Sequence, residues 1–215
     1  MFIEMEKKLS PVVCLEDIRF SYGSSLIIDH LSMDIYGGDF VAVKGPSGIG
    51  KSTLLNLIAG LLDPVSGVIL RDTDRIGYVF QQPNLLPWKT AEENIIIPLI
   101  SLEYEVGEAK QIAHEYLNKM ELWEFRKSYP SELSGGMAQR IALARAFAVN
   151  PEILLLDEPY SALDSGNKIL IRKLIENMLH EYKSTVLYVT HYPEDIEGLA
   201  NRSLTFISNS NIVVA

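Results

Sequence analysis

Hydrophobic and polar residues alternate in part over the first third of the chain, which is typical of half-buried strands. Strands are predicted over 12–20, 26–36, 40–44, 68–70 and 75–80. A helix is predicted from about Lys51 to Leu61, directly after a glycine-rich stretch. We expect this N-terminal part to be rich in β-structure, with antiparallel strands before residue 40.

The middle of the chain changes period, and apolar residues recur at helical spacing. Residues 91–125 and Met137 to Val149 are predicted to be mainly helical. From residue 150 the pattern alternates between strand and helix. Strands are predicted over 153–157, 185–190, 204–207 and 211–214, and helices over 166–182 and 193–200. Such alternation predicts an α/β core with parallel strands.

A single domain fits these elements. We expect a core made of 12–84 and 150–215, interrupted by a helical insertion over about 85–149. The 215 residues are 47% hydrophobic, enough for one sizeable core.

Composition restricts the possible functions. The net charge of -9 argues against broad binding to nucleic acid or to an anionic membrane surface. The one cysteine, Cys14, excludes an internal disulfide and a multi-cysteine zinc site. We find no signal peptide and no apolar run of membrane-spanning length. We therefore expect a chain that is soluble by itself and reaches a membrane only through a partner.

The stretch GPSGIGKST lies between an apolar strand and a helix and fits the pattern of a phosphate-binding loop. Its glycines let the backbone turn tightly and direct N–H groups inward. Lys51 opposes the helix dipole unless an anion lies between them, and Ser52 offers a hydroxyl to Mg²⁺. The alternative is a glycine-rich turn with an incidental lysine. Nucleotide-binding residues are predicted to be Gly45, Pro46, Ser47, Gly48, Ile49, Gly50, Lys51, Ser52 and Thr53.

The stretch ILLLDEP reads as a buried strand that ends in two acids. In an α/β sheet this edge is where ligands bind. We expect Asp157 to hold Mg²⁺ and Glu158 to orient or deprotonate the water that attacks a γ-phosphate. The alternative is a pair of solvated acids at a strand end.

Three further residues follow predicted strands and have open alternatives. His191 could hydrogen-bond a γ-phosphate or simply lie at a strand–helix junction. Gln81 could bind water or Mg²⁺ and sense phosphate, or be a loop glutamine. Tyr22 could stack on an adenine ring, or be an edge aromatic.

LSGGMAQR places Ser134, Gly135 and Gly136 before the helical run that starts at Met137. Glycine disfavours a helix, so the pair needs a reason. One interpretation is a flexible turn capped by Ser134. The other is a backbone that approaches an anion closely.

Taken in order, these segments resemble the ATP-binding cassette (ABC) family of transporter ATPases. The resemblance covers about residues 12 to 207 and has seven parts. They are Tyr22, the loop 45–53, Gln81, the signature segment 133–137, the strand end 153–158, SALD at 161–164, and His191. It implies a P-loop NTPase fold with an antiparallel β subdomain and a helical subdomain, ATP and Mg²⁺ as cofactors, and ATPase activity.

The resemblance also implies an assembly. Two copies would pack head to tail, so that Ser134, Gly135, Gly136 and Met137 meet the nucleotide of the other copy and Asp164 helps to cross the interface. Transmembrane permease subunits and a separate solute-binding protein would complete an importer at the cytoplasmic face of the membrane. The helical insertion would contact the permease near Gln81.

Met137 stands where the family usually has glutamine. Together with LLPW (85–88) and AEEN (91–94), it resembles the nitrate, sulfonate and taurine importer branch. The short stretch after the last matched strand implies that no C-terminal regulatory domain is present.

Alternatives of other classes are a soluble ABC-type ATPase in DNA repair, an exporter cassette and a small-molecule kinase. Long coiled-coil or zinc insertions would mark the DNA-repair ATPase. Fused membrane spans would mark the exporter, and a phosphate acceptor would mark the kinase. The first two features are missing from this sequence, and a kinase would need neither 133–137 nor 161–164.

Overall fold

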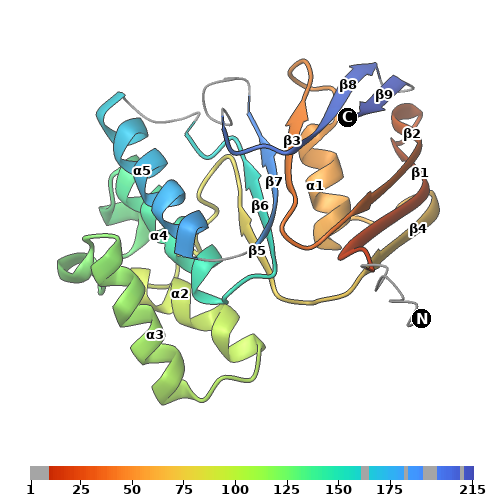
Figure 1. Cartoon of the computed structure of the whole chain (residues 1–215). Coiled ribbons are helices and arrows are strands. Elements are labelled where there is room, and N and C mark those ends of the chain that lie inside the picture. The colour runs from red at the N-terminus through yellow and green to blue at the C-terminus, as the bar shows by residue number, and fades with distance from the viewer. Residues whose placement is uncertain (1–9, 161–164, 182–183, 191–197, 209–210) are drawn as a thin grey trace, which may run out of the picture.

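Two β-sheets lie on opposite sides of helix α1 (Lys51–Ala59) in the computed structural model (Figure 1). The structure describes residues 10–160, 165–181, 184–190, 198–208 and 211–215. The smaller sheet is antiparallel, in the order β2–β1–β4. It consists of β1 (Val13–Tyr22), β2 (Ser25–Ile35) and β4 (Ser66–Arg71).

The larger sheet has the order β5–β6–β7–β3–β8–β9. All neighbours are parallel except β8 and β9. The strands are β3 (Phe40–Lys44), β5 (Ile76–Val79), β6 (Ile153–Asp157), β7 (Thr185–Val189), β8 (Arg202–Ser208) and β9 (Asn211–Val214). Because β5, β6, β7 and β3 are parallel, the residues that follow them gather at one edge.

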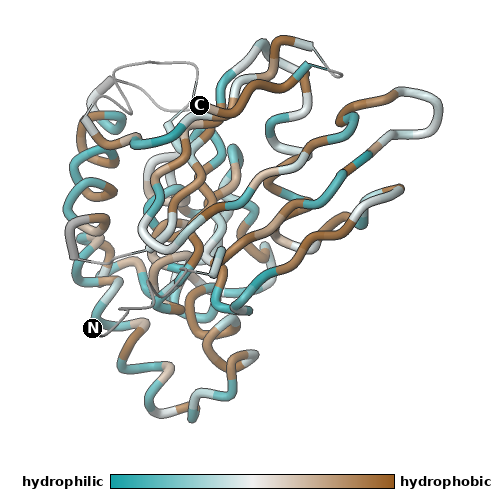
Figure 2. The backbone as a smooth tube through the Cα atoms, turned by 45° about the vertical axis from the view of Figure 1, so that its right-hand side comes forward, coloured by the Kyte–Doolittle hydropathy of each residue, from teal (hydrophilic) through white to brown (hydrophobic). Residues whose placement is uncertain are grey.

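Strand β3 contributes to two hydrophobic cores, one on each face of the larger sheet. Val41 and Val43 pack with α1 and the smaller sheet, whereas Phe40 and Ala42 pack with the helices on the opposite face. A strand buried on both faces is apolar throughout, as the run 40–43 predicts. Figure 2 shows the strands at the centre of the molecule as mostly hydrophobic.

Helices cover the second face of the larger sheet (Figure 1). They are α2 (Ala91–Ser101), α3 (Val106–Lys119), α4 (Gly135–Ala148) and α5 (Ser165–Glu181), with short 3₁₀ turns at Trp123–Phe125 and Pro130–Glu132. Thr90 caps α2 in a reciprocal arrangement with Glu93. None of the described helices combines the length and apolar composition needed to cross a membrane.

The predicted fold class is confirmed, and several element boundaries shift by two residues, among them the start of β8 at Arg202 and the end of α1 at Ala59. Helix α4 begins at Gly135, not at Met137, because Ser134 takes the N-cap position. Strand β4 begins at Ser66, ahead of the predicted 68–70, through pairing of Ser66 with Arg19. The helix predicted over 193–200 falls largely outside the described residues, and the division into subdomains at residues 84 and 150 stays a prediction.

Candidate nucleotide-binding site

The glycine-rich loop leaves β3 and ends at Gly50, which is the N-cap residue of α1. Gly48 has a φ of 75°, a conformation that favours glycine. Gly45 is needed for space, since a Cβ there would lie 2.8 Å from the carbonyl oxygen of Phe206 on β8. Ile49 packs against the core beneath the loop. The loop is therefore shaped by the fold around it as well as by its own sequence.

Lys51 is buried, and its ammonium is bound by the loop itself. Nζ donates hydrogen bonds to the carbonyl oxygens of Gly45, at 3.0 Å, and Pro46, at 2.8 Å. Burial lowers the pKa of Lys51, and the charges of Glu158 and Asp157 oppose that shift. The two loop carbonyls thus satisfy part of the hydrogen-bonding capacity of Lys51, and the anion expected beside it from the sequence stays a prediction.

Asp157 ends β6, is buried, and hydrogen-bonds with the hydroxyl of Ser52. Burial raises the pKa of Asp157, and the charge of Glu158 adds to the rise, while Ser52 and Lys51 counteract it. A hydroxyl beside a carboxylate fits Mg²⁺, which usually keeps several waters and binds substrate phosphates. No group of three or more potential side-chain ligands of the His, Cys, Asp and Glu types occurs among the described residues. The pair therefore suits Mg²⁺ carried with a nucleotide.

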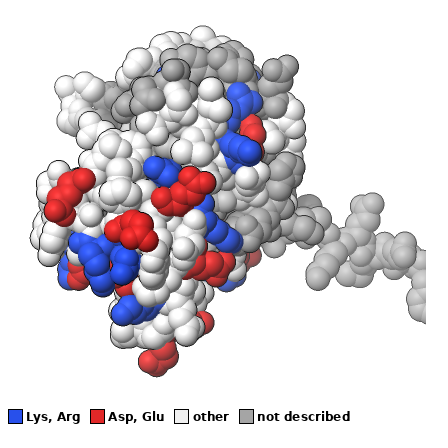
Figure 3. Space-filling view, turned by 90° about the vertical axis from the view of Figure 1, so that its left-hand side faces the viewer, with Lys and Arg blue, Asp and Glu red and all other residues white. Residues whose placement is uncertain are grey.

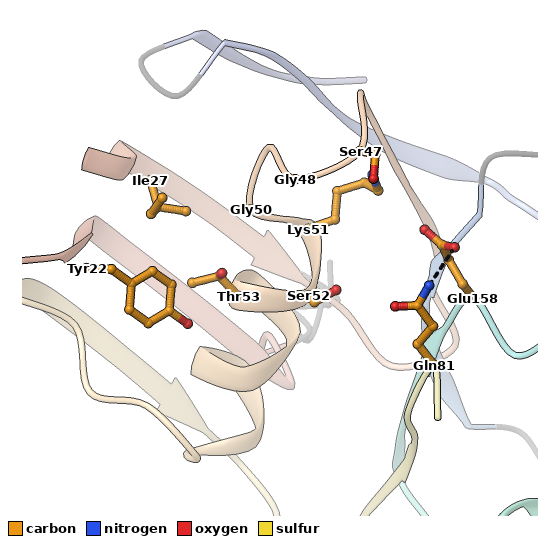
Figure 4. Close-up of a pocket in the computed structure, with 10 residues that line it drawn as sticks. All are labelled: Tyr22, Ile27, Ser47, Gly48, Gly50, Lys51, Ser52, Thr53, Gln81 and Glu158. Atoms are coloured by element: carbon orange, nitrogen blue, oxygen red, sulfur yellow. Dashed lines mark hydrogen bonds between the residues drawn. The ribbon is translucent and has the colours of Figure 1, made fainter. Parts of the chain in front are cut away.

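Glu158 and Gln81 face each other from neighbouring strand ends (Figure 4). Nε2 of Gln81 donates to Oε2 of Glu158 over 3.3 Å. Glu158 has a φ of 44°, which is uncommon for a side chain of this size, and its backbone N–H donates to the carbonyl of Val189. Such strained backbone clusters at functional sites. Here it accompanies a carboxylate that lines the pocket.

A cavity of about 360 Å³ lies over the loop. Figure 4 shows Tyr22 at one side of it and the pair of Gln81 and Glu158 at the other. The lining residues are Tyr22, Ile27, Ser47, Gly48, Gly50, Lys51, Ser52, Thr53, Gln81 and Glu158. Tyr22 is half exposed and makes an edge contact with Phe20. Ile27 was not predicted. In the β1–β2 hairpin Tyr22 pairs with Ser25, and this register brings Ile27 near Tyr22.

The signature segment does not line this cavity. Oγ of Ser134 accepts a hydrogen bond from the N–H of Met137 at 3.2 Å and caps α4. If residues 134–137 meet the nucleotide of another copy, as the resemblance implies, they should be exposed in a single chain. Ser134 and Gly135 are exposed, but Gly136 is buried and Met137 is partly buried against the helical core. Packing within the same chain therefore explains the burial of Gly136 and Met137.

The first turns of α1 and α4 carry no acidic residue. In contrast, α2 begins with Glu92 and Glu93, and α3 has Glu108 in its first turn. Carboxylates at a helix N-terminus interact favourably with the dipole but compete with a bound anion. Both glycine-led helices therefore keep their N-termini available to a phosphate.

A contact that sequence reasoning missed joins α4 to the carboxylate site. Buried Gln139 donates from Nε2 to the carbonyl oxygen of Pro159, at 3.0 Å, one residue beyond Glu158. In the sequence, only the position of Gln139 beside the signature segment points to a role for it. His191 and Asp164, predicted as site residues, lie outside the described residues.

Comparison with known proteins agrees with this geometry. The profile of the ABC transporter family matches residues 28–161. The aliphatic sulfonates import ATP-binding protein SsuB of Bacillus cereus is 41% identical over 187 residues, which cover 84% of this chain and 73% of that protein. An uncharacterized ABC transporter ATP-binding protein of Bacillus subtilis (strain 168), YtlC, is 45% identical over 168 residues, with 75% and 65% covered.

Among solved structures, the ATP-binding cassette MJ0796 was determined as a dimer in a post-hydrolysis state with ADP and Pi. It superposes with a TM-score of 0.81 at 34% identity, covering 94% of this chain and 98% of that one. The matching profile, the relatives and the nucleotide pocket agree: the chain belongs to the ABC transporter family, as an ATPase that binds ATP with Mg²⁺.

Proposed function

We propose that this ATPase powers an importer for a small anion of the nitrate, sulfonate or taurine type. The observation that carries the proposal is the sequence pattern Met137 with LLPW and AEEN, in a chain 41% identical to a sulfonate import ATP-binding protein. The substrate would be selected by a separate solute-binding protein and the permease, with this chain supplying the energy.

In this proposal the loop 45–53 holds the phosphates, and Lys51 turns from the loop carbonyls to them. Ser52, Gln81 and Asp157 hold Mg²⁺, which neutralises phosphate charge when bound. Glu158 orients the attacking water, and His191 stabilises charge that develops on the transferred phosphoryl group. Tyr22 stacks on the adenine. Gln81 reports the state of the site through its hydrogen bond with Glu158.

The proposed assembly contains two copies of the chain, head to tail. Each signature segment (Ser134, Gly135, Gly136 and Met137) then meets the nucleotide held by the other copy, and Asp164 crosses the interface. The dimeric ADP-bound relative supports this arrangement. The exposed, capped N-terminus of α4 supports it as well, because it lies outside the chain's own pocket.

We place the complex at the cytoplasmic face of the membrane, with permease subunits bound to the helical segment. Large apolar side chains are exposed in this segment: Trp88, which follows Gln81 closely in sequence and is 68% exposed, and Ile97 and Ile100 on α2. An exposed tryptophan beside a ligand-sensing loop fits a protein contact.

Nucleic acid is not among the proposed partners. On the face formed by the helices, basic and acidic side chains are interspersed, and no broad basic patch covers the described residues there (Figure 3). Together with the net charge of -9, this favours transport over a role on DNA.

Uptake by a strain that lacks the gene tests the proposal. We expect uptake of one of three labelled anions (taurine, ethanesulfonate or nitrate) to fall at least tenfold. A plasmid copy of the wild type should restore uptake, and a Lys51→Ala copy should not. Unchanged uptake of all three anions would reject the proposed substrate class.

A further inference from the structure

The two glycines of the signature segment have different surroundings. A Cβ built at Gly135 meets no atom within 4 Å. A Cβ built at Gly136 would lie 2.5 Å from Oδ1, 2.6 Å from Cγ and 2.9 Å from Nδ2 of Asn167. Neither glycine has a positive φ, so the backbone permits an L side chain at both positions. Of these two glycines, therefore, only Gly136 is required for steric reasons within a single chain.

Asn167 lies in the first turn of α5, which packs beside α4. Its side chain is partly buried, so moving it away from Gly136 has to displace atoms that pack around it. Residues 161–164 immediately precede α5 in the chain. The side chain of Asn167, on α5, therefore lies beside Gly136 of α4. Helix α5 begins directly after residues 161–164, which include Asp164 and are also expected at the interface between copies.

We propose that Asn167 is a positioning residue for hydrolysis: its side chain occupies the space beside Gly136 and fixes the distance between the N-terminus of α4 and α5. This sets where Ser134 and Gly135 stand when they meet the other copy's nucleotide. The inference rests on the proposed role of the signature segment. It assigns the two glycines separate tasks, close packing for Gly136 and access for Gly135.

The steric effect of a side chain at Gly136 can be measured on the isolated chain, without a second copy or a permease. Replacing either glycine by alanine favours the helix. At Gly135 nothing opposes this gain, so Gly135→Ala should raise the urea midpoint. Gly136→Ala should lower it by the clash with Asn167. In an Asn167→Ala background all three clashing atoms are gone, and Gly136→Ala should then raise the midpoint. A reversal of sign is the expected result.

Steady-state hydrolysis by the full chain tests the positioning. We expect Gly136→Ala to lower kcat for ATP at least fivefold with KM changed less than twofold, because the loop 45–53 is untouched. Adding Asn167→Ala should recover at least half of the lost kcat. Loss of folded protein alone would also lower the apparent kcat without changing KM, so each rate is divided by the folded fraction measured by circular dichroism under the assay conditions, and the fivefold loss must persist after this division.

The outcomes separate the two proposals. If Gly136→Ala destabilises equally with and without Asn167, or if its kcat is that of the wild type while Ser134→Arg is inactive, the inference about Asn167 is overturned. If Ser134→Arg itself hydrolyses ATP normally, the proposed role of the signature segment fails. The sign reversal in urea would then still describe the packing of Gly136, without a function in hydrolysis.

Discussion

Gln81 and Glu158 are joined by a hydrogen bond from Nε2 to Oε2 across the ends of two neighbouring parallel strands. One residue is a neutral amide and the other a carboxylate that lines the nucleotide pocket. An amide that donates to a carboxylate orients it without taking its charge. The hydrogen bond therefore fixes the direction of the Glu158 carboxylate, as the proposed role in positioning water requires.

Glu158→Gln should reduce ATP hydrolysis at least 100-fold, since general-base catalysis contributes about 10²–10⁴. Binding of ATP should remain, because the loop 45–53 is unchanged, and a dimer should accumulate with MgATP. Steady-state ATPase assays and size-exclusion chromatography measure both effects. Unimpaired turnover would exclude the role proposed for Glu158.

Ser134→Arg should block hydrolysis while the monomer still binds ATP. The arginine would stand at the capped N-terminus of α4, where the other copy's phosphate is proposed to lie, and loss of the cap should lower stability by about 1 kcal/mol. Fluorescent-nucleotide binding and ATPase rates separate the two effects. Ser131→Arg, at an exposed serine three residues earlier, is the matched control and should hydrolyse normally.

Asp157→Asn should stabilise the nucleotide-free protein at neutral pH and weaken Mg²⁺-dependent binding of ATP. Burial raises the pKa of Asp157 above 3.8, so its ionised form costs folding free energy. The stabilisation should be absent below pH 3.8 and grow as pH rises through the raised pKa. Urea unfolding of both proteins across this range, in EDTA, measures it. Equal midpoints at neutral pH would contradict the burial argument.

Glu92→Gln should lower the free energy of unfolding by about 2 kcal/mol, because it leaves Lys127 and His114 facing a buried neutral amide. The carboxylate is 3% exposed and contacts His114 at 2.9 Å and Lys127 at 2.7 Å. Burial acts to raise the pKa of Glu92, but these two partners outweigh it and the pKa is lowered.

The contribution of Glu92 should therefore be complete above pH 4.5 and disappear as pH falls through the lowered pKa. Glu124→Gln, at an exposed position of the turn near Lys127, serves as the control and should change stability by less than about 0.5 kcal/mol, as is usual at the surface. A similar loss in both variants would show that the buried cluster contributes nothing specific.

Most of the features that could be predicted depend on residues that are close together in the sequence. The loop 45–53 is contiguous and lies between a strand and a helix, so its existence and place follow from neighbouring residues, although the close approach of Phe206 to Gly45 does not. The positions of Gln81 and Asp157 at one edge followed from parallel strands, whose ends must meet. Contacts between distant segments could not be predicted, because they depend on how α4 packs against α5 and against the segment that follows β6. Gly136 beside Asn167 and Gln139 on the carbonyl of Pro159 are of this kind.

The ammonium of Lys51 donates hydrogen bonds to the carbonyls of Gly45 and Pro46. The loop is therefore stabilised by the same group that is proposed to bind phosphate. In that proposal, binding of ATP exchanges the acceptors of one ammonium and leaves little backbone to order. Preorganisation of this kind transfers the entropic cost of the site from binding to folding.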